Sequence, residues 1–261
     1  MIDIHAHILP GVDDGAQNVG ESLHMLRDGI ADGIRGVVCT SHVLDRLDKS
    51  TEKRFVDAFH LLRTRVKDAG LPISLWLGSE LHTQSEFNMR SPVATFNANG
   101  KYALLELPMG HVPRDAEDRF FQLSVNGVTP ILAHPERNII LMQRPGVTYN
   151  LVHRGVLLQV NAGSLTGRFG KRVKQAAFEM IDLRWVHFVA SDCHSPAGRS
   201  MKLGHARDIV TKRWGDETAV RLFETNPLKA VQGETIVQPE PLPPRKGGLR
   251  SGLLGKIFRS A

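Results

Sequence analysis

The sequence contains only two cysteines, Cys39 and Cys193, among 261 residues. Two cysteines are too few for a disulfide framework in a chain of this length, so both thiols are expected to be reduced. Long apolar runs are also missing, and none approaches the roughly 20 residues needed to cross a bilayer. No signal peptide is recognised near the N-terminus, because the order of basic, apolar and small residues is absent. The body of the chain is therefore expected to be cytosolic.

The part of the chain expected to fold also lacks a large excess of basic residues. The formal net charge is +6, but several cations fall in the last stretch of the chain, namely Arg245, Lys246, Arg250, Lys256 and Arg259. The rest is close to neutral, whereas nucleic-acid binding needs cations clustered on a folded face or groove. No nucleic-acid partner is therefore expected. A composition of 41% apolar and 23% charged residues favours one large α/β domain with a sizeable core.

Short apolar, β-branched runs recur along the chain, and each predicts a buried strand. They are Ile2–Ile4, Gly36–Thr40, Ile73–Gly78, Tyr102–Leu107, Thr129–Ala133, Leu157–Val160 and Val186–Ala190. Segments between them have apolar residues at helical spacing. Examples are Phe55, Phe59, Leu62 and Val66, and Val173, Ala177, Met180 and Ile181. About seven strands alternating with helices predict an α/β fold whose parallel sheet closes into a barrel.

The composition changes at Gln238 to a proline-rich stretch followed by basic residues and glycine. The sequence therefore predicts a barrel over residues 1–237 and a flexible, basic tail over 238–261. Apolar residues in the tail could share one face of a short helix: Leu249, Leu253, Leu254, Ile257 and Phe258. That leaves open a membrane-surface or partner contact beside plain disorder.

Polar side chains of metal-ligand type follow the predicted strands. In a parallel barrel the reactive groups belong at the carboxyl ends of the strands, where the loops converge. The residues found there are His5, His7, Asp14, His42, Glu80, Glu106, His134, Asp192 and His194. Asp14 has a second interpretation, because Asp13-Asp14-Gly15 also reads as a turn. A carboxylate such as Glu106, directly after an apolar run, is costly to bury unless it is paired or binds a metal.

Two of these segments carry metal-ligand residues that are two positions apart. Side chains two residues apart lie on the same side of an extended segment, so His5 and His7 can bind one ion, and Asp192 and His194 repeat the pattern. Nine nitrogen and oxygen ligands suit two or three divalent cations. Such a centre suits phosphoryl chemistry, because one metal lowers the pKa of a bound water so that hydroxide attacks at neutral pH.

Two arginines are candidates for holding the phosphate. Arg137 lies about one turn beyond His134, and a guanidinium there can bind a phosphate with two hydrogen bonds. Arg199, which follows Pro196-Ala197-Gly198, is the second candidate. An ordinary surface position remains the alternative for each.

The sequence resembles the PHP (polymerase and histidinol phosphatase) superfamily and, more narrowly, its capsule and exopolysaccharide tyrosine phosphatases. The resemblance runs from Met1 to about Val231. It lies in the stretches Met1–Gly15, Gly78–Glu80, Tyr102–Glu106, Ala133–Arg137, Gln159–Leu165 and Ala190–His194, together with Asn226-Pro227.

This resemblance implies a distorted (β/α)7 barrel with a trinuclear centre, usually active with manganese. It implies dephosphorylation of the tyrosine-rich tail of a bacterial tyrosine autokinase that controls polysaccharide export. His5, His7, Glu80 and Asp192 would hold one ion, Glu80, Glu106 and His134 a second, and Asp14, His42 and His194 a third. Arg137 matches the family's phosphate-binding arginine. Iron, zinc or cobalt would suit the same ligands, and the sequence fixes neither the metal nor whether the chain forms an oligomer.

The sequence departs from the family at the second-strand histidine. Ser41 replaces the usual proline, and Val43-Leu44-Asp45 replace residues that are often basic. This loop borders the expected substrate mouth, so the preference among phosphotyrosine peptides stays open.

Three other functions remain as alternatives. Cys193 and Arg199 have the spacing of cysteine-dependent tyrosine phosphatases, although that reading leaves the other polar residues unexplained. A small-molecule phosphatase of the histidinol-phosphate type could use the same metal centre. A catalytically silent binding module, anchored by its tail to a membrane or a kinase, is the third.

Overall fold

The computed structural model describes residues 1–237 and 239–244. Its strands are β1 (Ile2–Ala6), β2 (Gly36–Cys39), β3 (His42–Val43), β4 (Ser74–Leu77), β5 (Glu80–His82), β6 (Tyr102–Glu106), β7 (Thr129–Ala133), β8 (Leu157–Asn161) and β9 (Val186–Ala190). All seven predicted strands are present within a residue or two of their expected bounds. Every strand pairing recorded in the two sheets is parallel, which confirms the predicted α/β class.

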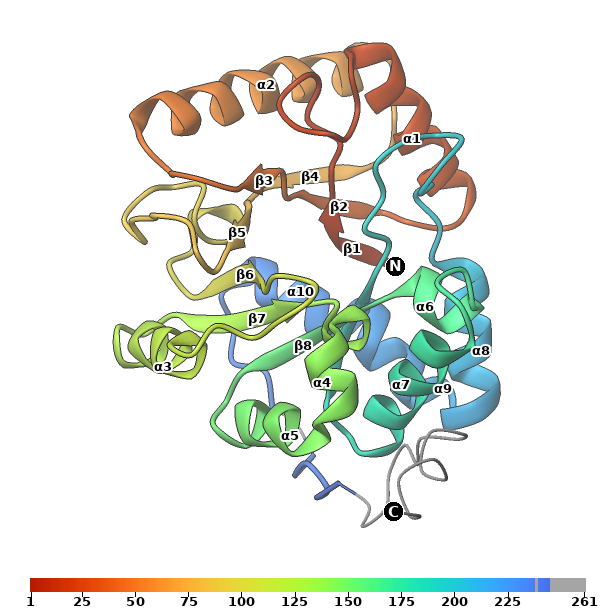
Figure 1. Ribbon diagram of the computed structural model, residues 1–261. Helices are drawn as coiled ribbons and strands as arrows, with labels where there is room; N and C mark the ends of the chain where they lie inside the picture. Colours follow the sequence, from red (N-terminus) through yellow and green to blue (C-terminus); the bar gives the residue numbers. More distant parts are fainter. Residues whose placement is uncertain (238, 245–261) are drawn as a thin grey trace, which may run out of the picture.

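Helices surround these strands (Figure 1). They are α1 (Val19–Ala31), α2 (Lys49–Asp68), α3 (Ala116–Val125), α4 (Ile139–Gln143), α5 (Pro145–His153), α6 (Ala162–Thr166), α7 (Lys171–Asp182), α8 (Gly204–Trp214), α9 (Asp216–Val220) and α10 (Asn226–Gln232). Short turns of 3-10 helix, η1 (Phe96–Ala98) and η2 (Pro135–Arg137), and a π-helical turn, η3 (Arg221–Thr225), complete the elements. The two segments predicted from helical spacing are α2 and α7.

The strands form two sheets, in the orders β1-β2-β4 and β3-β5-β6-β7-β8-β9. The predicted count of about seven strands was too low. The chain breaks its sheet pairing after β2 and again after β4, and the short strands β3 and β5 that follow pair in the other sheet, with His42 opposite Glu80. The first break therefore places His42 in the six-stranded sheet, and the second break places Glu80 there.

The two sheets also meet where β1 and β9 end. The amide of Asp192 donates to the carbonyl of His5 at 2.9 Å, and the amide of His7 donates to the carbonyl of Cys193 at 2.9 Å. These hydrogen bonds link the first strand to the last one. They bring two candidate ligand segments together from near opposite ends of the described chain.

Strand residues alternate between two apolar clusters, as expected when both faces of a sheet are covered. On β6, Leu104 belongs to an inner cluster and Leu105 to an outer one that includes helical residues. On β9, Phe188 lies in the inner cluster and Val189 in the outer. The inner cluster draws on β1, β2, β6 to β9, η1 and α10, and its fully buried members include Ile4, Val38, Phe96, Leu104, Ile131 and Phe188.

Part of the predicted tail contacts the folded body. The amide of Leu242 donates to the carbonyl of Leu183, and the indole Nε1 of Trp185 donates to the carbonyl of Leu242 at 2.8 Å. The expected apolar helix face and the basic residues from Arg245 onward lie outside the described residues. Within residues 1–237 and 239–244, no helix combines the length and apolar character that a bilayer crossing requires.

Truncating Phe188 tests the inner cluster. The substitution Phe188→Ala is expected to lower the free energy of unfolding by about 3–5 kcal/mol, because it leaves a cavity at a fully buried site. Urea denaturation of the metal-free protein measures the change. Phe121→Ala, at a side chain that is 57% exposed on α3, is the matched control and should change stability by less than about 0.5 kcal/mol. Equal effects of both substitutions would contradict the assignment.

Candidate metal centre

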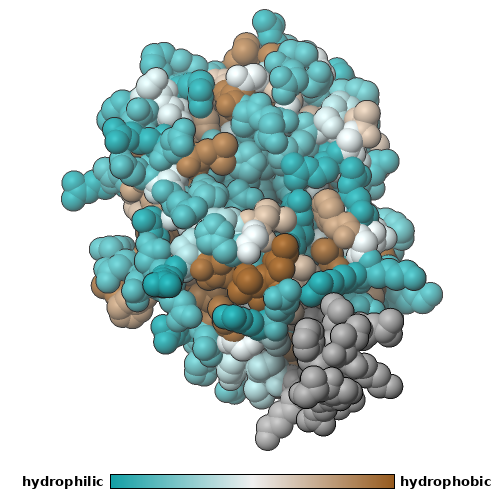
Figure 2. Space-filling view, viewed as in Figure 1, coloured by the Kyte–Doolittle hydropathy of each residue, from teal (hydrophilic) through white to brown (hydrophobic). Residues whose placement is uncertain are grey.

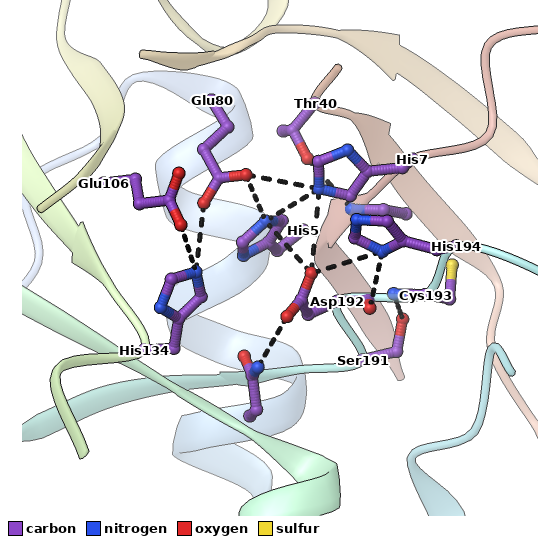
Figure 3. A network of polar contacts seen from close by, with 12 residues as sticks. His5, His7, Thr40, Glu80, Glu106, His134, Ser191, Asp192, Cys193 and His194 are labelled. Carbon is purple, nitrogen blue, oxygen red and sulfur yellow. Dashed lines mark hydrogen bonds and ion pairs between the residues drawn. The ribbon is translucent and has the colours of Figure 1, made fainter. Parts of the chain in front are cut away.

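Most of the nine predicted side chains converge at the carboxyl ends of the strands (Figure 3). His5 lies in β1, His42 begins β3 and Glu80 begins β5. Glu106 ends β6, while His134 directly follows β7. His7 and Asp14 lie in the segment after β1, and Asp192 and His194 lie in the segment after β9. The expectation that reactive groups lie at the carboxyl ends of the strands therefore identified residues that are far apart in the chain.

The tightest group consists of His5, His7, Glu80 and Asp192. The Nε2 atoms of His5 and His7 are 3.1 Å apart, and they lie 3.1 and 3.2 Å from Oε2 of Glu80. Oδ1 of Asp192 is 3.6 Å from Nε2 of His5 and 3.7 Å from that of His7. Ligands that each bind a metal at about 2.0–2.2 Å are separated by similar distances. This group has the size of a cage for one cation.

The second group uses the other oxygen of Glu80. Nε2 of His134 is 3.2 Å from Oε1 of Glu80 and 3.5 Å from Oε1 of Glu106. Glu80 thus faces two groups of ligands with its two oxygens, as a bridging carboxylate does in a two-metal site.

The third group contains Asp14, His42 and His194. Oδ1 of Asp14 is 3.6 Å from Nε2 of His42 and 3.5 Å from Nε2 of His194. His42 also reaches the second group, since its Nδ1 lies 3.0 Å from Oε2 of Glu80 and 3.8 Å from Oε2 of Glu106. The geometry therefore joins the second and third groups through both nitrogens of one ring.

Several buried polar atoms in these groups have no hydrogen-bond partner. They are Oε2 of Glu80, Nδ1 of His42 and Nε2 of His194. A buried polar atom without a partner costs free energy, and an ionised carboxylate costs more. Cations placed between the groups would satisfy all three atoms. The residues present therefore fit a centre of divalent metals, in both donor type and spacing.

Protons compete for the same positions. Burial opposes protonation of His7, but its hydrogen bond with Asp13 and the negative charge of Glu80 outweigh it and raise its pKa to about 10. Burial alone would raise the pKa of Glu80, but the charge of His5 and the hydrogen bond between Oε1 and His134 hold it well below its usual value. Glu80 is therefore ionised. Metal binding at such a site releases protons, so metal affinity rises with pH.

His194 differs from the other rings. Burial, and next the neighbouring His7, lowers the pKa of His194 to about 3, so its imidazole is neutral. Neutral imidazole is the form that binds metals. Glu106 has a raised pKa because of burial and the nearby charge of Glu80.

Two side chains that the sequence analysis missed orient the first pair of histidines. Nδ1 of His5 donates to Oε1 of Gln159 at 2.8 Å, and Nδ1 of His7 donates to Oδ2 of Asp13 at 2.9 Å. In the neutral, metal-binding form of each ring, this hydrogen bond keeps the proton on Nδ1 and directs the lone pair of Nε2 at the cage. Asp13 also accepts from the amide of Gly15, which is the predicted turn. Because the turn already explained Asp13, its hydrogen bond with His7 was not predicted from the sequence. The only sequence signal for Gln159 was that a polar residue stands within an apolar strand.

Gly15 is required by the close approach of the turn to the metal segment. A Cβ atom at this position would lie 2.1 Å from the carbonyl oxygen of His7. The amide of Ala16 donates to that same carbonyl at 3.0 Å. The glycine therefore lets the turn pack directly against one of the candidate ligands.

Both predicted arginines contact Asp192. The NH1 groups of Arg137 and Arg199 donate to its Oδ2 at 3.0 and 2.9 Å. Nδ2 of Asn161 donates to the same oxygen at 2.7 Å, and Asn161 was also missed as a site residue. Oδ1 of Asp192 thus faces the cage while Oδ2 is held by three donors. The guanidinium of Arg137 lies 4.4 Å from the ring centroid of Phe169, which fixes it from the other side.

Two of the candidate ligands have strained backbones. His134 has a φ of 34° and Asp192 a φ of 52°, in the left-handed region that residues other than glycine rarely adopt. Each costs on the order of 1–3 kcal/mol and persists only when the surrounding structure requires it. The strain turns both side chains toward the cage at the point where β7 and β9 end.

Cys193 does not have the environment of a catalytic thiol. Its side chain is fully buried. Burial, followed by the charge of Asp3, raises the pKa of this thiol well above its usual value. A nucleophilic cysteine needs an accessible site and a lowered pKa. The cysteine-dependent alternative therefore conflicts with the structure.

The open space beside the centre is a pocket of about 660 Å³. The candidate ligands Asp14, His42 and Glu106 line one part of it. Val43, Leu44 and Asp45, where the sequence departs from the family, line another part. These three residues therefore lie where a substrate would enter.

Replacing Asp13 tests the orientation of His7. Asp13→Asn is expected to weaken Mn²⁺ binding by roughly 10- to 100-fold, because the carboxylate that holds Nδ1 is lost. Titration calorimetry of the apo protein measures this change. Asp45→Asn, at an exposed carboxylate lining the same pocket, is the control and should leave affinity unchanged. Similar affinities for the two variants would show that Asp13 does not support the centre.

Comparison with known proteins identifies the family. The family described as "Capsular polysaccharide synthesis, CpsB/CapC" matches residues 1–232. Tyrosine-protein phosphatase YwqE of Bacillus subtilis is 34% identical over 94% of this chain and 97% of its own length. Tyrosine-protein phosphatase CpsB of Streptococcus pneumoniae is 29% identical over 90% of this chain and its full length.

A solved structure is also similar. It comes from work on YwqE of B. subtilis and CpsB of S. pneumoniae, which describes both as metal-dependent tyrosine phosphatases. The TM-score is 0.85 at 32% identity, and the match covers 94% of this chain and 100% of that chain. From the family match over residues 1–232 and the similarity of its sequence and fold to these relatives, this chain belongs to the CpsB/CapC family of capsular polysaccharide synthesis.

Proposed function

We propose that this protein is a metal-dependent protein-tyrosine phosphatase. The observation that carries the proposal is the cage around Glu80, where two carboxylate oxygens face four histidines from three separate segments. The relatives named as tyrosine-protein phosphatases over nearly their full length support the same reaction.

The centre would hold three divalent cations, with manganese as the expected metal and iron, zinc or cobalt as chemically compatible ones. The proposed ligands are His5, His7, Glu80 and Asp192 for one ion, Glu80, Glu106 and His134 for a second, and Asp14, His42 and His194 for a third. When bound, such cations acidify water for attack on phosphorus and offset the charge of the phosphoryl oxygens.

Arg137 and Arg199 would bind the phosphoryl group. Each guanidinium uses NH1 to contact Asp192, which leaves its other N–H groups for the substrate. A guanidinium pair held in place by a shared carboxylate loses little conformational freedom when a phosphate arrives. The two arginines would therefore orient the phosphoryl group over the centre.

An aromatic leaving group is favoured by apolar surface near Arg137. Ile139 begins α4 two residues later and is 47% exposed, and its amide donates to the carbonyl of Met109, which is 39% exposed. Figure 2 shows an apolar patch on this otherwise mostly hydrophilic face, in the region where Figure 1 draws α4. A phenyl ring could pack there, whereas the polar histidinol chain would gain less.

The finer architecture is proposed as a distorted (β/α)7 barrel of the PHP type. The shared inner apolar cluster and the hydrogen bonds between the segments after β1 and β9 support closure. The division into a phosphatase barrel over 1–237 and a tail over 238–261 is proposed with it, although Leu242 contacts the body.

The physiological substrate is proposed to be a phosphotyrosine protein, namely the tail of a tyrosine autokinase that controls capsule or exopolysaccharide synthesis. The family description supports a role in capsule synthesis. The reaction would then take place in the cytoplasm, at the inner surface of the membrane that holds the kinase. A membrane contact through the basic tail concerns residues outside the described ones.

Removal of metal distinguishes the two phosphatase mechanisms. Chelator treatment, or His134→Ala, is expected to lower the hydrolysis of p-nitrophenyl phosphate by at least about 100-fold, because the charge-stabilising centre is lost. His5→Ala should do the same. Added Mn²⁺ should restore the chelated wild type but not either variant.

Cys193→Ser is the contrasting variant and should keep most of the activity. Circular dichroism checks that each variant is folded. Inactive Cys193→Ser together with indifference to chelator would reverse the proposal in favour of thiolate chemistry.

The choice of substrate class needs a separate comparison. The ratio kcat/KM is expected to favour a phosphotyrosine peptide over histidinol phosphate by at least about tenfold, because the apolar surface near Arg137 suits an aryl group. Both substrates are assayed with the same Mn²⁺-loaded enzyme. Preference for histidinol phosphate would remove the protein-tyrosine assignment but leave the metal mechanism in place.

A further inference from the structure

A second pocket, of about 210 Å³, lies beside the metal centre. The residues used below are Arg168, Phe169, Ser191, Arg199 and Lys202, all of which line it. It is formed by the segments around α6, the segment after β9 and the start of α8. It is separate from the larger pocket lined by the loop after His42.

The lining of this second pocket carries positive charge and no carboxylate. Arg168, Arg199 and Lys202 are its cations, and no Asp or Glu side chain lines it. Among the described ion pairs, neither Arg168 nor Lys202 has a partner. The only recorded side-chain hydrogen bond of Arg168 goes to the carbonyl of Gly198 at 3.2 Å. Arg168 and Lys202 therefore keep their charge available to a ligand, whereas Arg199 shares its charge with Asp192.

The larger pocket is different in charge. It contains Arg46 and Arg54, but Asp13, Asp14, Asp45 and Glu106 line it as well. Arg46 is also paired with Glu86 outside the lining. An anionic group would therefore meet opposing carboxylates there, whereas the second pocket offers it cations alone.

The second pocket adjoins the reacting centre through shared residues. Arg199 lines the pocket and donates to Asp192, a candidate ligand. Ser191 precedes that ligand in the chain, and the ring of Phe169 packs against Arg137. A substrate phosphate held by Arg137 and Arg199 would therefore lie next to the entrance of the pocket.

We propose that this pocket binds a second anionic group on the same peptide substrate, either a carboxylate or another phosphoryl group on a side chain near the phosphotyrosine. In an extended peptide, residues two apart point the same way and lie roughly 6.5–7 Å apart. A neighbouring side chain can therefore reach a pocket that shares one arginine with the centre. This inference rests on the proposed phosphatase function.

Three peptides that differ only near the phosphotyrosine test the pocket. One has neutral neighbours, one has glutamate two residues away, and one has a second phosphotyrosine there. For the wild type, kcat/KM is expected to be about three- to tenfold higher for the anionic peptides, and the advantage should fall as salt increases. The relative rates on the last two peptides tell which anion the pocket prefers.

The variant Arg168→Gln/Lys202→Gln should lose this preference while its rate on p-nitrophenyl phosphate is unchanged. The control, Lys67→Gln/Lys212→Gln, removes the same charge from exposed lysines of α2 and α8 that do not line the pocket, and should keep the preference. Lys202→Glu, at an exposed side chain without a recorded contact, should reverse it.

Equal rates of the wild type on all three peptides would overturn the inference, as would equal losses in the two double variants. Either result, with normal hydrolysis of p-nitrophenyl phosphate, leaves the phosphatase function standing. Absence of all phosphatase activity would instead overturn the proposed function.

Discussion

A buried, ionised carboxylate is the constraint around which the rim of this fold is arranged. Glu80 is excluded from water, and its charge must be balanced by whatever lies beside it. Oε2 faces His5, His7 and His42, and Oε1 faces His134. Four rings from three segments thus depend on one side chain. Without cations the balance is made by protons, which explains why the pKa values of His5, His7 and His42 are raised while that of Glu80 is lowered.

The interrupted sheets follow from the same constraint. If β4 continued without a break, Glu80 would stay in the pairing register of the smaller sheet. Instead the chain resumes as β5 and pairs with β3, so that Glu80 lies opposite His42 and beside β6, which ends at Glu106. The breaks in the ladder therefore place a shared carboxylate between ligands from both sheets. Positive φ angles at His134 and Asp192 serve the same end at β7 and β9.

The sequence predicts the elements and the convergence of polar side chains, but not the supports behind them. Apolar runs defined the seven main strands, since burial on both faces leaves a clear pattern. The short strands β3 and β5 have no such pattern, because two or three residues carry no period. Gln159 and Asn161 could not be assigned, since their partners His5 and Asp192 lie far away in the chain. The role of Asp13 in a local turn was enough to explain that residue, so its hydrogen bond with His7 was not predicted.

The hydrogen bonds between the segments after β1 and β9 have a consequence for biosynthesis. His5 and His7 emerge early from the ribosome, whereas Asp192 and His194 emerge only after most of the body has been made. The tight four-residue group is therefore incomplete throughout most of translation. A nascent chain would offer a metal ion only part of this set of ligands. The full affinity for the ion requires the segment after β9, which is synthesised late.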